Sequence, residues 1–139
     1  MTRPGTVLFA ALLAASAALA AVVVHARSPD LVLEVTRFPT AISPNGDGSH
    51  DVARIRFFVR ETDPNATVEI VGPNLTVART LAERPLIANE PVTLSWNGRT
   101  DSGALADPRD RYRLRVILPG EDRDMVYPRR IAVRGVGPG

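Results

Sequence analysis

Apolar and polar residues alternate over short runs in this 139-residue chain, and that alternation constrains its fold more than any other feature. In residues 53–60 the apolar side chains occupy every second position, and three arginines occupy positions of the opposite face. Residues 112–118 repeat the pattern. Because successive side chains of a β-strand point to opposite faces, each run predicts a strand with one buried and one solvated face.

Five further runs have strand character and are separated by Gly, Pro, Asn and Asp, namely residues 31–36, 68–70, 75–81, 92–96 and 125–134. Pro128 interrupts the last run, and because proline cannot donate a ladder hydrogen bond, it predicts an edge strand or a bulge there. About seven strands in roughly 100 residues predict an all-β fold, a seven-stranded immunoglobulin-like antiparallel β-sandwich. We expect Trp96, the only tryptophan, to lie in its core.

The amino-terminal segment is of a different kind, because residues 6–24 form a run of nineteen residues without a charge. As a helix this run would span roughly 28 Å, about the hydrocarbon thickness of a bilayer. Arg3 precedes it, which favours export of everything after Arg27. A secretory signal peptide is the alternative, because Val24 and Ala26 are small residues at the two positions that a signal peptidase recognises.

We therefore expect residues 1–28 to be one hydrophobic helix that serves as a membrane anchor or a signal peptide, and residues 29–139 to be the sandwich domain. The length of the apolar run favours the anchor. Both alternatives place the folded domain outside the cytoplasm.

Composition narrows the chemistry that the chain can carry. It has no cysteine, which excludes disulfides, thiolate metal sites and a cysteine nucleophile. All 17 basic residues are arginine, but the net charge is only +2, so the composition gives little support for nucleic-acid binding, and we expect no nucleic-acid partner.

Two motifs stand out within the predicted domain. The first occupies residues 38–51 and reads FPTAISPNGDGSHD; the second occupies residues 96–103, reads WNGRTDSG, and is followed by YRL at residues 112–114. Together and in this order they resemble the FlgD-like immunoglobulin domains, β-sandwich modules related to part of the flagellar hook-capping protein and appended to many exported bacterial proteins. The resemblance covers roughly residues 31–134. His50 stands where such sequences often carry Asn, and residues 108–111 replace a common Asp-Gly turn.

This resemblance implies a fold and an exported location, in which such modules serve as spacers, assembly surfaces or anchors. The hook-capping role itself does not follow, because this chain is too short for the rest of that protein.

The first motif also suggests an ion site. Asn45, Asp47, Ser49 and Asp51 carry oxygen ligands at every second position, as in the calcium loops of EF-hands, and the glycines between them can adopt positive φ. These four residues predict a possible calcium site. The alternative is that Asn45 and Asp47 form Asx-turns and that no ion binds.

The second motif could supply further ligands. In a sandwich of standard strand order its loop would approach the first motif, so Asp101 and Asp107 are possible extra calcium ligands. An enzyme is the less favoured alternative: a metal-assisted hydrolase that uses the acidic loop, with His50 as the acid–base residue.

Arginines recur on the predicted outward face of two strands. Arg54, Arg56 and Arg60 lie on one and Arg111, Arg113 and Arg115 on the other, where they could form a basic sheet face that meets an anionic wall polymer or lipid headgroups. The alternative is a solvated face that hinders edge pairing.

The sequence therefore predicts a non-catalytic interaction or scaffold module, held to the membrane by its amino-terminal helix or secreted after cleavage. Its partner is expected to be an extracytoplasmic protein or a cell-envelope polymer. If the first strand leaves the bilayer near Leu31 and rises over about 26 Å, the loop of residues 45–51 points away from the membrane.

Overall fold

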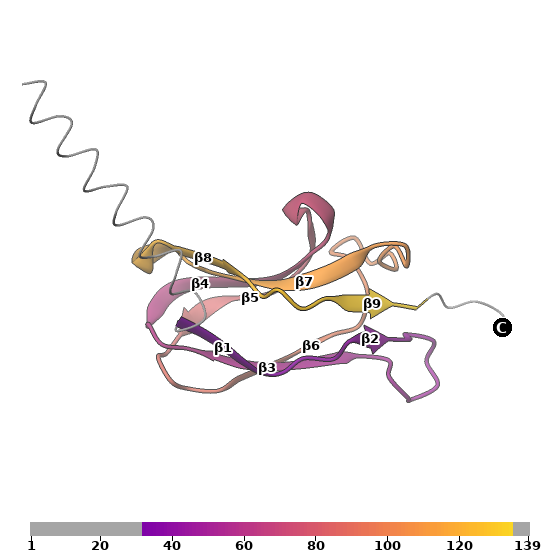
Figure 1. Ribbon diagram of the computed structural model, residues 1–139, viewed down its shortest axis with the longest axis horizontal. Helices are drawn as coiled ribbons and strands as arrows, with labels where there is room; N and C mark the ends of the chain where they lie inside the picture. The colour runs from indigo at the N-terminus through magenta and orange to yellow at the C-terminus, as the bar shows by residue number, and fades with distance from the viewer. Residues whose placement is uncertain (1–31, 135–139) are drawn as a thin grey trace, which may run out of the picture. The chain divides into compact units, whose positions relative to one another are not determined.

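The computed structural model describes residues 32–134, and regular structure there consists of β-strands joined by loops and two short 3₁₀ turns (Figure 1). The strands are β1 (Leu33–Arg37), β2 (Ala41–Ile42), β3 (Ala53–Val59), β4 (Asp63–Val71), β5 (Val77–Leu86), β6 (Val92–Trp96), β7 (Arg111–Leu118), β8 (Arg123–Val126) and β9 (Ile131–Val133). The turns are η1 (Pro73–Leu75) and η2 (Pro119–Glu121).

The strands form two sheets, which Figure 1 shows as two layers. One sheet has the order β1-β3-β6. The other has the order β2-β9-β7-β4-β5, and β8 also pairs with β7. All pairs of strands are antiparallel except β2 with β9, which run parallel.

The core lies between the inner faces of the sheets, where alternation along each strand places the apolar side chains. In β3 the burial alternates strictly, and in β7 every second residue is buried. The largest side chains with almost no exposed surface are Trp96, Phe57, Ile42, Ile55, Ile70, Leu114, Leu118 and Ile131. The transfer of such side chains from water contributes roughly 1.5–3 kcal/mol each.

The predicted all-β sandwich is confirmed, whereas two details of the prediction are wrong. The described residues contain nine strands rather than seven, and the sheets are not wholly antiparallel. The sequence could not reveal β2 because two residues are too few to show a period. Pro128, which was expected to mark an edge strand or a bulge, instead lies between two strands: it divides the last run into β8 and β9, which both pair with β7.

The predicted helix of residues 1–28 and the boundary at residue 29 lie outside the described residues. Within residues 32–134, no helix is long and apolar enough to cross a membrane.

Candidate functional site

The loop between β2 and β3 carries the first motif and is organised by the carboxylate of Asp51. Its Oδ1 accepts hydrogen bonds from the backbone N–H groups of Asn45 (3.1 Å) and Gly46 (2.9 Å), and its Oδ2 accepts one from Gly48 (2.6 Å). Hydrogen bonds to an ionised acceptor are about twice as strong as neutral ones. The loop is therefore wrapped around the side chain of its own last residue.

Two Asx-turns complete this loop, as one of the two alternatives predicted. The side-chain oxygen of Asn45 accepts a hydrogen bond from the N–H of Asp47 (3.1 Å), and that of Asp47 accepts one from Ser49 (2.8 Å). Gly46 and Gly48 have φ of 78° and 81°, a region that other residues adopt only with strain. Hydrogen bonds inside the loop thus engage side-chain oxygens of all four predicted calcium ligands, because Oγ of Ser49 is hydrogen-bonded to the His50 ring.

His50 also belongs to this loop and has a positive φ of 57°. Its Nδ1 lies 2.9 Å from Oγ of Ser49, and its carbonyl oxygen accepts the N–H of Ser43 at 2.7 Å. An activated serine requires a base that a third group orients. Among the described residues, no carboxylate is hydrogen-bonded to the His50 ring, because Asp51 is turned toward the loop backbone.

The loop after β6 carries the second motif and meets the first one at Gly98. A Cβ placed on Gly98 would lie 3.0 Å from Cγ of Pro44 and 3.2 Å from Cδ1 of Ile42, and the residue has φ of 78°. The indole N–H of Trp96 donates to the carbonyl oxygen of Arg99 at 2.9 Å, which ties the loop to the core. The predicted approach of the two motifs is therefore present where Gly98 lies against the side chains of Pro44 and Ile42.

The carboxylates that were expected to reach across are engaged elsewhere. Asp101 accepts a hydrogen bond from the N–H of Thr80 (3.0 Å) in β5 and lies 3.9 Å from Nε of Arg79. Asp107 forms a two-pronged ion pair with Arg109, at 3.1 Å and 2.8 Å. The side-chain and backbone hydrogen bonds from Arg109 lower the pKa of Asp107 to about 2.

Within residues 32–134, no group of three or more His, Asp or Glu side chains is placed so as to hold a metal ion. Calcium binding by Asn45, Asp47, Ser49 and Asp51, with Asp101 and Asp107, stays a prediction. The hydrogen bonds of the loop favour the alternative in which Asx-turns shape it without an ion.

Tyr112, at the start of β7, fixes the end of the second loop. Its hydroxyl donates to the carbonyl oxygen of Asp107 at 2.9 Å, and its ring packs against Trp96 with centroids 5.2 Å apart. Burial raises the pKa of the Tyr112 hydroxyl, so the group keeps the proton that it donates. The alternation of polar and apolar residues gave no sign of this bond, which joins the strand to the loop that precedes it.

The two rows of arginines do not form one face, which corrects the expectation that they could combine. Arg54 and Arg56 project from β3 in the three-stranded sheet, and Arg60 directly follows that strand. Arg111, Arg113 and Arg115 project from β7 in the other sheet. Because the inner faces of the sheets enclose the core, these outer faces lie on opposite sides of the sandwich.

Arg37 is a residue that the sequence analysis missed, and it lies beside Arg54 at a hollow next to the first motif. This hollow, about 300 Å³ in volume, is lined by both arginines together with Asp51, His50 and four smaller residues. Arg37 follows the last residue that the period of two assigns to the first strand. A β-bulge between Val35 and Arg37 brings it onto the face of Arg56.

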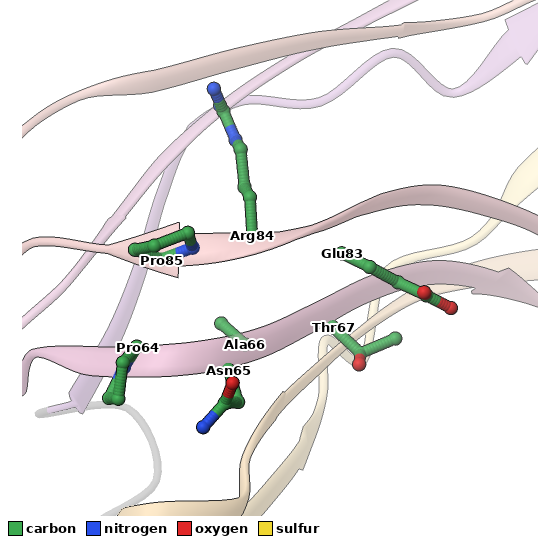
Figure 2. A pocket seen from close by; sticks show the side chains of 7 residues that line it. All are labelled: Pro64, Asn65, Ala66, Thr67, Glu83, Arg84 and Pro85. Carbon is green, nitrogen blue, oxygen red and sulfur yellow. The ribbon is translucent and has the colours of Figure 1, made fainter.

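A second hollow of similar size lies on the β4–β5 hairpin and is drawn in Figure 2. Arg84 points to one side of the hairpin, while Asn65 and Glu83 point to the other. Its charged and polar groups therefore diverge, and they do not surround a common point at which a ligand could bind.

No protein-family model matches this chain, and no curated protein matches it.

Proposed function

We propose that residues 32–134 form an immunoglobulin-like interaction module that works outside the cytoplasm and has no catalytic role. The proposal includes the membrane anchor over residues 1–28, which retains the module at the cell envelope. The alternative that a signal peptidase releases the module changes only its attachment.

Strand order supports the immunoglobulin-like part of the proposal. In immunoglobulin domains one sheet contains strands A, B and E, and the other contains C, F and G, with C′ added in variable domains. The sheet β1-β3-β6 follows the first order, and β9-β7-β4-β5 follows G-F-C-C′. Tyr112 lies at the start of β7, and its hydroxyl donates to the carbonyl oxygen of Asp107, five residues earlier. This bond has the form of the tyrosine corner of immunoglobulin folds.

The observation that carries the proposed interaction role is the structure of the Asn45–Asp51 loop. Residues 45–50 are exposed, yet three hydrogen bonds to Asp51 fix their backbone, and Gly98 of the second loop packs beneath Pro44. A rigid, exposed loop loses little conformational entropy when a partner binds. Loops positioned by a rigid scaffold commonly carry binding function.

Cysteine labelling tests the location, because the chain has no cysteine and an introduced one is the only thiol. Ser49→Cys places a thiol in the exposed loop, and Thr2→Cys places one ahead of the apolar run. With a membrane-impermeant maleimide and intact spheroplasts, we expect labelling of Ser49→Cys, and labelling of Thr2→Cys only after lysis. Protection of Ser49→Cys until lysis would refute the proposed location; loss of the Thr2→Cys segment from the mature chain would show cleavage.

The same thiol tests the interaction surface. Ile87→Cys is a matched control, because Ile87 is exposed at the opposite end of β3, where Asn89 bonds to Val59. A partner on the Asn45–Asp51 loop would slow labelling of Ser49→Cys in spheroplasts relative to the purified chain, and would not slow labelling of Ile87→Cys. Equal rates at both positions in both samples would contradict contact at this loop.

A further inference from the structure

The outer face of the three-stranded sheet brings three arginines together. Arg37 of β1 lies directly opposite Arg56 of β3 in the antiparallel register, and Arg54 lies two residues along the same strand, on the same face. Directly opposed residues have Cα atoms about 4.5–5.5 Å apart, and alternate residues of a strand are about 6.6 Å apart. Like charges directly opposite each other destabilise a sheet.

No ion pair within residues 32–134 neutralises these three arginines. Among residues 32–134, none of the three forms an ion pair, and the positions opposite Arg54 and Arg56 on β6 are the neutral Ser95 and Thr93. Glu34 on β1 is engaged 2.8 Å from Arg60, whose guanidinium also covers the ring of Phe58 at 4.9 Å. In the part of the chain that the structure describes, three positive charges are thus left together without an ion-pair partner.

The hollow beside the first motif gives these charges a place to receive a ligand. Arg37 and Arg54 line it with His50, and its volume is about 300 Å³. Asp51 is the one carboxylate in its lining, and three backbone N–H groups of the loop already bind both oxygens of that carboxylate. The groups that remain for a ligand are therefore predominantly cationic.

We propose that Arg37, Arg54 and Arg56, with His50, form a binding site for a polymer that carries oxyanion groups, phosphate or carboxylate, at short intervals along its chain. Guanidinium groups bind both kinds of oxyanion through paired N–H donors. A row of cations at steps of about 5–7 Å matches successive anions along one chain better than it matches a single compact anion.

That such a polymer is the partner in the cell rests on the proposed function outside the cytoplasm. The test of the site does not, because binding is measured on the purified chain wherever the protein is located. Failure of the cysteine labelling would refute the location alone, and failure of the binding experiment would refute the site alone.

The experiment uses the full chain in an uncharged detergent and compares the unaltered chain with the double variant Arg37→Gln/Arg54→Gln. Sodium polyphosphate and polyglutamate are titrated by calorimetry at several salt concentrations, and glycerol phosphate at equal total charge represents a single lipid-type headgroup. The control is Arg84→Gln/Arg129→Gln, which removes the same charge from exposed positions elsewhere.

We expect at least one polymer to bind the unaltered chain, with affinity at least about tenfold lower for Arg37→Gln/Arg54→Gln and nearly unchanged for the control. The slope of log affinity against log salt concentration should fall by about two, because two ionic contacts are lost. The arm that binds more tightly identifies phosphate or carboxylate as the preferred group. A melting curve of each variant establishes that it is folded.

Three results would overturn the proposal. The double variant could bind both polymers as tightly as the unaltered chain. The control could lose as much affinity as the double variant, which would make the binding a property of net charge. Glycerol phosphate could bind as tightly as the polymers, which would show a site for a single headgroup.

Discussion

Arg115 on β7 and the arginines that meet across β1 and β3 lie on opposite outer faces of the sandwich, and they differ in whether a carboxylate balances their charge. On β7, Arg115 donates two hydrogen bonds to Asp124, at 2.8 Å and 2.6 Å, and lies 3.3 Å from Glu69 of β4. On the other face, Arg37, Arg54 and Arg56 have no such partners among the described residues. Arg115 is thus balanced by carboxylates of its own fold, whereas Arg37, Arg54 and Arg56 form the site that we propose for an external partner.

Burial explains why Glu69, on the outer face formed by β4 and β7, needs a cation beside it. Glu69 is only 6% exposed although it projects outward, and a carboxylate in that environment requires a nearby cation. The arginines of β3 are exposed, and water screens their repulsion. Unpaired arginines can therefore remain on the outer face of β1 and β3, because their repulsion lowers the stability of the fold only slightly.

The largest loss of stability should come from removing Arg115, the cation beside Glu69. We expect Arg115→Gln to destabilise the protein by about 3 kcal/mol, because Glu69 would remain buried without its cation. Urea denaturation measures the loss. The double variant Glu69→Gln/Arg115→Gln should recover most of it; no recovery would show that the packing of the Arg115 side chain, rather than its charge, stabilises the fold.

The second largest loss of stability is expected from replacing Asp51, which lines the same hollow as Arg37 and Arg54. Asp51→Ala should cost about 2 kcal/mol, because three backbone N–H groups lose an ionised acceptor. Asp47→Ala is the control and should cost less, because within residues 32–134 the Asp47 side chain accepts a single hydrogen bond, from the N–H of Ser49. Equal losses in the two variants, measured by urea denaturation, would contradict the organising role of Asp51.

Removing one of the unpaired arginines of β1 and β3 should raise the stability of the protein rather than lower it. We expect Arg37→Gln to stabilise the protein by about 0.5 kcal/mol at low salt, because the repulsion between Arg37 and Arg56 disappears. The gain should shrink as salt is added. Arg113→Gln on β7, which lies opposite the apolar Val71, should give no comparable gain in parallel urea titrations.

Acid should weaken the ion pair between Arg115 and Asp124. The hydrogen bonds from Arg115 lower the pKa of Asp124, so its folded-state pKa lies below the value of about 3.9 in the unfolded chain. The pair therefore stabilises the fold above about pH 4 and ceases to do so as the pH falls below that. Melting temperatures between pH 6 and pH 2.5 should fall less for Asp124→Asn than for the unaltered chain; equal falls would contradict the assignment.

The smallest effect is expected from calcium. Because hydrogen bonds already engage Asn45, Asp47 and Asp51, we expect millimolar calcium or excess chelator to leave the melting temperature of the full chain unchanged. A rise of several degrees on calcium addition would show preferential binding to the folded state and would restore the predicted ion site.

The candidate site was predictable to the extent that it is local. The Asn, Asp and Gly pattern of residues 45–51 predicted Asx-turns because each of those hydrogen bonds spans two residues. The bond from Gly120 to the buried Asp63 at the other end of the sandwich spans 57 residues, and no local pattern predicts it. The hydrogen bond from the N–H of Thr80 to Asp101 could not be predicted for the same reason, since it joins a loop to a strand 21 residues earlier.

The sequence by itself determined that the chain forms strands, which residues of β3 and β7 face the core, and where glycine permits the turns of the first motif. Only the tertiary structure decided that β3 and β7 belong to different sheets, and that a bulge places Arg37 opposite Arg56. The physical reason is that periodicity depends on neighbouring residues, whereas sheet membership and register depend on pairing between distant segments, where a shift of one residue exchanges the two faces.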